Sequence, residues 1–207
     1  MGAGKSTLAK HMESEFGLTR VAWGDAMKLE FFDSMRSGAV PDFIERPNIL
    51  FPNIPNDERK IIWVDRHKHE VRIALQQYAT EYRRAQDSMY WVKRGLARIQ
   101  NLLDAEKTLV VDDTRFPDEL KALKYRGFVV AIIKVSSTNQ TERIMQRDGR
   151  FDPKSREHSS ERALNGYSFD VRISNDRDLE KLRGFGTVLL EAASLSISRK
   201  APAIALG

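Results

Sequence analysis

The opening run Met1–Thr7, MGAGKST, constrains the fold of this chain more than any other stretch. It matches the second half of a phosphate-binding loop, G-x-x-x-x-G-K-[ST], and leads directly into an amphipathic helical pattern that ends near Phe16. Small residues let backbone N–H groups curl around phosphate oxygens, and the N-terminus of the following helix attracts negative charge. Because such a loop connects a β-strand to a helix, the motif predicts an α/β fold that binds phosphate.

The polar residues of this loop have distinct expected roles. The ammonium group of Lys5 would reach the β- and γ-phosphates of a nucleotide, and the Ser6 hydroxyl would ligate Mg²⁺. The predicted phosphate-binding set consists of Gly2, Ala3, Gly4, Lys5, Ser6 and Thr7. Glycine, lysine and hydroxyl residues in this order at the start of a helix are a strong indication of such a loop.

The strand that should precede the loop, together with the loop's first glycine, would lie before Met1. An empty central position in the sheet would leave backbone groups of the neighbouring strands unpaired, at about 1–3 kcal/mol for each group. At the other end of the chain, Ala203–Leu206 is an apolar run followed by Gly207. One hypothesis is that this run fills the central position, as in a circular permutant, with Gly207 beside Met1. The alternative is a start codon assigned too far downstream, with a frayed tail.

Composition and charge narrow the class of protein. A chain of 207 residues with 41% hydrophobic and 30% charged residues predicts one globular domain, 1–207. The net charge of +5 suits an anionic ligand, but no basic run exceeds two residues, so we expect no nucleic-acid partner. The chain lacks cysteine, and no apolar run approaches the ~20 residues of a membrane span, so we expect no disulfides and no membrane partner. A cytoplasmic protein is the plain expectation.

Short apolar runs alternate with helical patterns, which predicts a parallel sheet with helices on both faces. Expected strands cover 19–23, 108–113, 128–135 and 169–173, and expected helices cover 24–35, 71–84, 88–103, 116–125, 138–146 and 178–194, the last interrupted by glycines. Residues 36–62 are interpreted as a loop excursion and residues 147–161 as a lid. The sequence therefore predicts a three-layer α/β fold whose ligands lie at the carboxyl ends of the strands.

Charged side chains follow the expected strand 108–113. Asp112 and Asp113 stand where a P-loop enzyme has a carboxylate that holds the water shell of Mg²⁺ or orients an acceptor oxygen. The alternative is a solvated strand end. Arg115 comes two residues after Asp113 and could bind a phosphate group with two parallel hydrogen bonds.

Three arginines, Arg143, Arg147 and Arg150, would supply guanidinium groups from a helix end and the segment after it. Positive charge around a transferring phosphoryl group accounts for most of its catalysis, so these side chains are candidates for that role. The alternative is a charged surface.

A second group of candidates lies earlier in the chain. Asp25 and Lys28 share the first turn of an expected helix, where they could contact a substrate or simply form a capping and surface pair. Trp91 could stack on a nucleobase, although a core position is the alternative. His67 and His69 diverge on a helix at this spacing, so we predict no zinc site.

With these motifs laid out, the chain resembles the bacteriophage deoxynucleoside monophosphate kinases, a branch of the P-loop nucleotide kinases, over most of its length. The matching stretches are GAGKST (2–7), GDAMK (24–28), LQQYATE (75–81) with Arg84 and YWV (90–92), DTRFPDE (113–119), and HSSE (158–161) before Asp170 and Asn175. One departure is Ala79, which stands where we expect a glycine before Thr80. The other is the first strand of the fold, which would be absent or replaced by 203–206.

The resemblance implies a P-loop kinase fold and transfer of the γ-phosphoryl group of ATP to a deoxynucleoside 5′-monophosphate, with Mg²⁺. It implies catalytic roles for Lys5, Asp113, Arg115 and Arg147; ATP-phosphate binding by the loop residues and Arg143; acceptor binding by Asp25, Lys28, Arg84, Trp91 and Arg115; and Mg²⁺ ligation by Ser6 and Asp113. It also places the excursion 36–62 near the acceptor.

Two alternatives to this function remain open. One is a related small-molecule kinase, such as a dephospho-coenzyme A kinase type, and the other is a non-catalytic nucleotide-binding module with an impaired loop. Because related kinases often dimerise, a homodimer is a further expectation, and a phage-encoded enzyme would act in the host cytoplasm.

Overall fold

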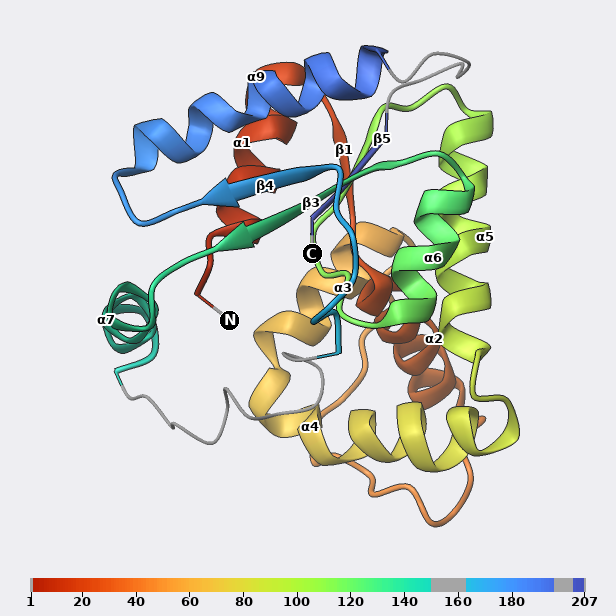
Figure 1. Cartoon of the computed structure of the whole chain (residues 1–207). Coiled ribbons are helices and arrows are strands. Elements are labelled where there is room, and N and C mark those ends of the chain that lie inside the picture. Colours follow the sequence, from red (N-terminus) through yellow and green to blue (C-terminus); the bar gives the residue numbers. More distant parts are fainter. Residues whose placement is uncertain (1, 150–162, 196–202, 207) are drawn as a thin grey trace. The chain divides into compact units, whose positions relative to one another are not determined.

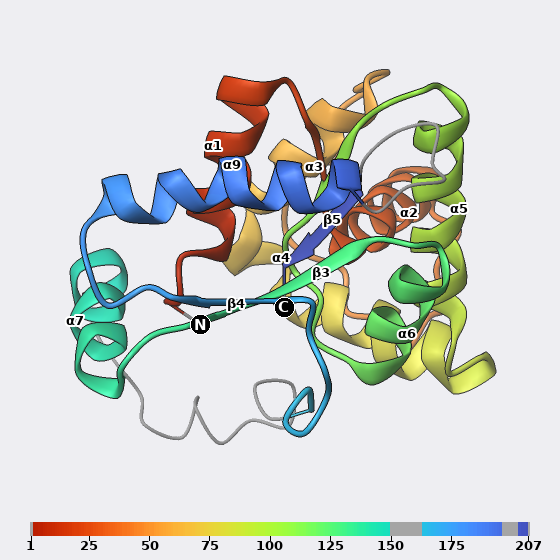
Figure 2. The ribbon, with the colours of Figure 1, turned by 45° about the horizontal axis from the view of Figure 1, so that its top comes forward.

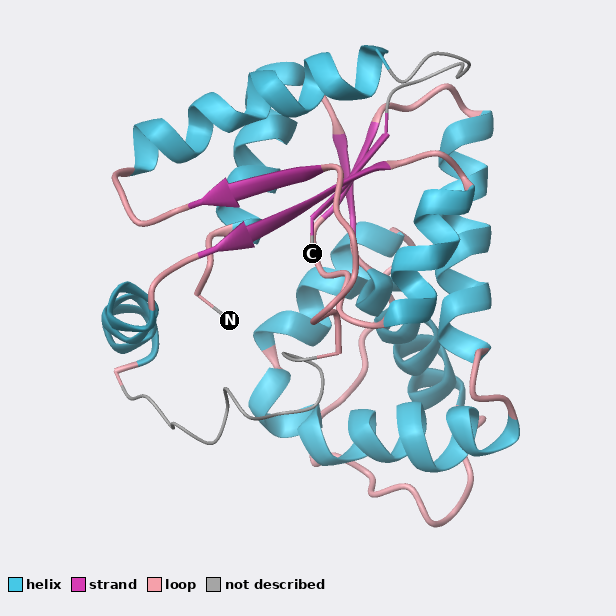
Figure 3. Cartoon of the chain, in the orientation of Figure 1, coloured by secondary structure: helices cyan, strands magenta, loops and turns pink. Residues whose placement is uncertain are grey.

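A computed structural model describes residues 2–149, 163–195 and 203–206 of the chain (Figure 1). The chain divides into two compact units. The first unit comprises residues 1–22 and 99–207 and contains a β-sheet, and the second comprises residues 23–98 and is helical (Figure 3). We call them the sheet unit and the helical unit and describe each by itself.

The sheet unit contains a five-stranded sheet in which every pair of neighbours is parallel. Its strands are β1 (Thr19–Val21), β2 (Leu109–Val111), β3 (Val129–Lys134), β4 (Val171–Ser174) and β5 (Ala203–Leu206), in the order β1-β2-β5-β3-β4. The last strand of the chain therefore lies in the centre. The prediction that residues 203–206 fill this position is confirmed, while the predicted contact of Gly207 with Met1 falls outside the described residues.

The sequence of β5 explains why it is accepted between two other strands. Ala205 is level with Val111 of β2 and with Val130 of β3, so β5 pairs on both edges. All four of its residues are at most 2% exposed. A parallel strand covered on both faces needs a continuous apolar run, and AIAL provides one without a polar side chain to desolvate. Ile204 and Leu206 belong to the main hydrophobic core of the sheet unit.

Helices cover the sheet on both faces (Figure 2). Helix α1 (Lys5–Phe16) packs against α9 (Leu179–Leu195) on one face, and α6 (Pro117–Tyr125) packs against β3 on the other. The predicted interruption of the last helix at its glycines is wrong, because α9 is continuous. Gly186 instead allows a close approach, since a Cβ there would lie 3.0 Å from the Phe16 ring. Helix α7 (Ser137–Asp148) follows β3.

The helical unit is built around an aromatic core. Its elements are α2 (Trp23–Ser37), α3 (Asp57–Arg66), α4 (Lys68–Gln76), the π-helix η1 (Gln77–Arg84) and the first part of α5 (Tyr90–Asp104), which continues into the sheet unit. Phe31, Phe32 and Tyr78 are completely buried in this core. No helix in the described ranges is long and apolar enough to cross a membrane.

Two features of the helical unit differ from the sequence prediction. The excursion predicted for 36–62 is shorter, because α2 runs to Ser37 and α3 begins at Asp57. The Asn56 side chain caps α3 by accepting a hydrogen bond from the Arg59 N–H (2.9 Å), which is the usual way to satisfy a free amide at a helix start. The helix predicted for 71–84 forms, but its second half is an eight-residue π-helix.

Candidate phosphate-binding site

The loop before α1 has the backbone shape that only glycine adopts readily. Gly2 has φ +69° and Gly4 has φ +96°, both in the left-handed region. Gly4 is the residue before the helix, and its carbonyl accepts a hydrogen bond from the Leu8 N–H (2.9 Å). A side chain at either position would strain the backbone, so the two glycines are required for this turn.

Neighbouring elements pack tightly against the same loop. A Cβ at Gly2 would lie 3.2 Å from Ile144 on α7, and a Cβ at Gly4 would lie 2.5 Å from the Asn175 amide nitrogen. The Asn175 Nδ2 also donates a hydrogen bond to the Ala3 carbonyl (2.8 Å). The predicted phosphate-binding loop is therefore held by α7 on one side and by the β4–α9 loop, residues 175–178, on the other.

The predicted phosphate-binding side chains stand at the start of α1. Lys5 is its first residue and is half-buried, and Ser6 and Thr7 are exposed. The first turn of α1 contains no acidic residue that would occupy its positive end. Backbone N–H groups at a helix N-terminus and a lysine in its first turn favour an anion, above all a phosphate.

The two aspartates after β2 have different environments. Asp112 is 2% exposed, and its carboxylate lies 3.1 Å from the Arg20 Nε on the neighbouring strand β1. Among the described residues neither carboxylate oxygen has a hydrogen-bond partner of good geometry, so this pair is mainly one of charge. Asp113 is half-buried. Asp112 therefore forms an ion pair with Arg20, and Asp113 remains the candidate for the site.

The segment after Asp113 is fixed by one buried carboxylate. Glu119 in the first turn of α6 is 6% exposed and accepts hydrogen bonds from the backbone N–H groups of Arg115 (2.8 Å) and Phe116 (3.0 Å). This is half of a capping box, in which a helix residue reaches back to amides before the helix. It fixes the backbone that carries Arg115, whose side chain is exposed.

The predicted lid arginines belong to α7 and the segment after it. The Arg143 Nη2 donates to the Arg177 carbonyl in the β4–α9 loop (3.3 Å). Arg147 lies in the last turns of α7, but its side chain is outside the described part, as are Arg150 and the lid prediction beyond residue 149.

Asp176 ties the β4–α9 loop to the start of α7. Its carboxylate accepts hydrogen bonds from the Ser136 N–H (2.6 Å) and the Asn139 side-chain amide (3.2 Å). The Ser136 N–H bond is the main reason why the pKa of Asp176 lies below its ordinary value, because it stabilises the charged form. One short loop thus contacts both the phosphate-loop candidate and the helix that leads to the predicted lid.

Four of the five predicted acceptor residues lie in the helical unit, and the fifth, Arg115, lies in the sheet unit. Lys28 pairs with Asp65 (2.8 Å) and lies 3.9 Å from Asp25. Trp91 is 5% exposed in the aromatic core, and its Nε1 donates to the Ala79 carbonyl (2.9 Å), which fits the alternative of a core residue. Arg84 is exposed at the end of η1.

The helical unit also contains a polar cluster that the sequence does not predict. Glu30 accepts hydrogen bonds from the hydroxyls of Tyr78 (2.9 Å) and Tyr90 (2.8 Å) and pairs with the Arg83 Nε (2.6 Å). Burial is the main cause of the raised pKa of both tyrosines. The partners are far apart along the chain, so no local pattern could have indicated the cluster.

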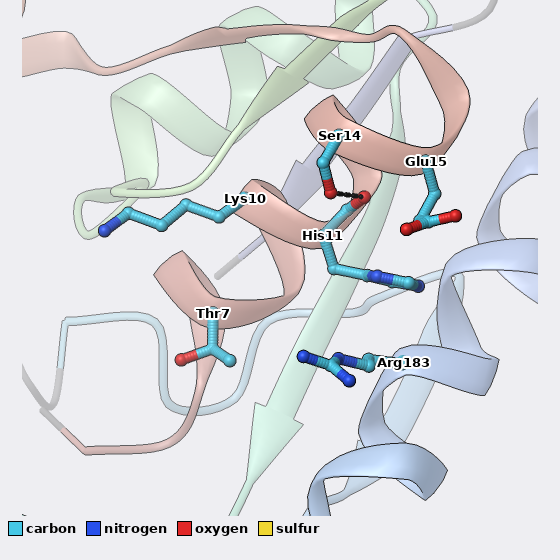
Figure 4. A pocket seen from close by; sticks show the side chains of 6 residues that line it. All are labelled: Thr7, Lys10, His11, Ser14, Glu15 and Arg183. Carbon is cyan, nitrogen blue, oxygen red and sulfur yellow. Dashed lines mark hydrogen bonds between the residues drawn. The ribbon is translucent and has the colours of Figure 1, made fainter.

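A shallow pocket of about 360 Å³ lies between α1 and α9 (Figure 4). It is lined by Thr7, Lys10, His11, Ser14, Glu15 and Arg183. Figure 4 shows the side chains of His11 and Arg183 extending into the gap between the two helices. Within the described ranges there is no group of three or more His, Cys, Asp or Glu side chains that could hold a metal ion.

Comparison of the sequence with protein-family models gives no match, and comparison with curated proteins gives none either.

Proposed function

We propose that this protein is a nucleotide kinase that transfers the γ-phosphoryl group of ATP to a deoxynucleoside 5′-monophosphate. The observation that carries the proposal is the loop at Gly2–Gly4: two left-handed glycines lead into α1, and Lys5 is its first residue. The position of the loop supports it as well, because the loop contacts the residues that follow β4, at the carboxyl edge of a parallel sheet. Ligands of such sheets bind at this edge.

Each proposed role follows from the chemistry of the side chain. The amides of the loop and the Lys5 ammonium would bind the β- and γ-phosphates, where negative charge increases in the transition state. Arg115 and the α7 arginines Arg143 and Arg147 would neutralise the transferring group. Asp113 would orient the acceptor oxygen. Positioning and charge neutralisation are sufficient, because phosphoryl transfer requires little covalent participation by the protein.

The donor groups at this site fit Mg²⁺. Mg²⁺ prefers oxygen ligands, and it is usually bound by one or two carboxylates together with substrate phosphates and water. The Ser6 hydroxyl and the Asp113 carboxylate provide such oxygens. Ser6 lies in the first turn of α1, and Asp113 lies two residues before Arg115, whose backbone N–H donates to Glu119. The ion would neutralise charge on the β- and γ-phosphates.

The proposal is tested by an ADP-release assay with each deoxynucleoside monophosphate in turn and with dephospho-coenzyme A as the competing acceptor. Lys5→Ala should lower turnover by about a thousandfold, the scale for losing one group that stabilises transition-state charge. Lys121→Ala, on the exposed side of α6, is the matched control and should retain full activity. Saturable ATP binding without transfer to any acceptor would instead indicate a binding module, and equal rates for the two variants would contradict the role of Lys5.

A further inference from the structure

Asn175 is the first residue after β4 and is 5% exposed. Its backbone N–H donates to the Lys134 carbonyl at the end of β3 (2.7 Å), which fixes the residue to the sheet edge. Its side-chain Nδ2 donates to the Ala3 carbonyl (2.8 Å). A buried amide is thus anchored to the sheet at its backbone and to the phosphate-loop candidate at its side chain.

The hydrogen bond to Ala3 determines the direction of the next amide. The peptide bond between Ala3 and Gly4 is trans and planar, so its C=O and N–H point in opposite directions. Because the carbonyl points at Asn175, the Gly4 N–H points to the other side of the loop. Asn175 packs so closely that a Cβ on Gly4 would lie 2.5 Å from its Nδ2, and the peptide has little freedom to rotate.

We infer that Asn175 is a positioning residue that aims the Gly4 N–H at the bound phosphate. It touches no phosphate itself and acts through the Ala3–Gly4 peptide. The inference rests on the proposed function for its ligand, a nucleoside triphosphate. An amide that is already oriented makes its hydrogen bond without a reorganisation cost, which is how rigid donors contribute most to binding and to charge stabilisation.

The connections of the same loop explain how Asn175 keeps its position. Asp176 accepts hydrogen bonds from the start of α7, and the Arg177 carbonyl accepts one from Arg143. The Ser174 hydroxyl donates to the Asp176 carboxylate (3.0 Å) and has no contact of this kind with Ala3. Ser174→Ala therefore disturbs the same loop but leaves the Asn175–Ala3 bond in place, which makes it the matched control.

The sequence offers a direct probe of this peptide. Of the 12 glycines, only Gly4 follows an alanine. Protein labelled with ¹³C at alanine carbonyls and ¹⁵N at glycine amides therefore gives a single carbonyl–amide correlation in NMR, from Ala3–Gly4. The variants are Asn175→Asp, which keeps the shape but replaces a donor by an acceptor, and Asn175→Ala, which removes the donor.

In both Asn175 variants the Ala3 carbonyl signal should move to the position of a carbonyl without this hydrogen bond. The Kd for Mg-ATP should rise about tenfold or more, which is the scale for losing one hydrogen bond to a charged group. Ser174→Ala should change neither. If the variants do not fold, the parent protein still provides a test: its Ala3 carbonyl signal should lie at the position of a hydrogen-bonded carbonyl, and its Gly4 amide should shift on titration with pyrophosphate, whereas an Ala3 signal typical of a carbonyl without a hydrogen bond would overturn the inference.

The outcomes separate the inference from the proposed function. An unchanged Ala3 signal in folded variants, or parent-like ATP affinity in them, overturns the role of Asn175 and leaves the kinase proposal intact. A parent protein whose Gly4 amide responds to neither Mg-ATP nor pyrophosphate overturns both.

Discussion

Replacing Ile204 by alanine tests whether the last described strand is the central strand of the sheet. Ile204 is completely buried, pairs with Val110 on β2 and Val129 on β3, and belongs to the same core as Leu8 and Leu189. Removing buried methyl and methylene groups from such a site costs about 2–5 kcal/mol, because the surrounding core closes the resulting cavity only in part. A domain of this size has a total stability of about 5–15 kcal/mol, so the loss should be large.

The assay is urea unfolding followed by far-UV circular dichroism, with parent and variant compared at the same pH. The control is Leu195→Ala, at the end of α9 and 75% exposed, which should change the free energy of unfolding by less than about 0.5 kcal/mol. Both positions are close in the sequence and both lose a branched aliphatic side chain, so the difference between them measures burial. Equal midpoints for the two variants would refute the placement of Ala203–Leu206 in the sheet.

Two further substitutions test the edges of the candidate site. Asp112→Asn removes the charge from a buried carboxylate, and we expect the free energy of unfolding in urea to fall by about 1–3 kcal/mol. The loss should be smaller than for a fully buried ion pair, because Arg20 is one-third exposed. A change smaller than that of an exposed aspartate variant would argue against the ion pair. Asp176→Asn removes a carboxylate whose pKa is lowered from 3.8 mainly by the Ser136 N–H. The stabilisation from a lowered pKa is complete above the pKa of the unfolded state and disappears as the pH falls through the pKa of the folded state. The Tm values of parent and variant should therefore differ at pH 7 and converge below pH 3.8. A difference in Tm that stays constant with pH would contradict this assignment.

The strand order was predictable because the apolar run at 203–206 matches the central strand that the loop motif requires. The glycine-lysine motif requires a central strand, and Ala203–Leu206 is apolar enough to be buried on both faces, so the order of the sheet could be anticipated. The helix at 57–66 was not predictable, because the prolines before it indicate a loop, while its start depends on a single capping residue, Asn56. The π-helix at 77–84 was not predictable, because its hydrophobic spacing in a short window looks like that of an α-helix.

For the candidate site, the sequence indicates the motif but not the contacts around it. Asp112 and Asp113 are adjacent and chemically identical, and the difference in their environments comes from Arg20 on another strand. The polar cluster around Glu30 and the Asn175–Ala3 bond are likewise long-range contacts. Asn175 follows the same rule as the aspartates, since it too is a polar residue directly after a strand of the parallel sheet.

The contacts of the phosphate-loop candidate suggest that its geometry is controlled from outside the motif. Gly2 and Gly4 make the turn possible, and the side chains that pack closely against these glycines are Ile144 of α7 and Asn175 after β4. Those two segments are joined to each other by the hydrogen bond from the Ser136 N–H to Asp176. A residue that binds phosphate directly loses a single interaction when it is substituted, whereas loss of Asn175 changes the orientation of a peptide bond. Substitution of Asn175 should therefore affect nucleotide affinity more than its distance along the chain from the motif suggests.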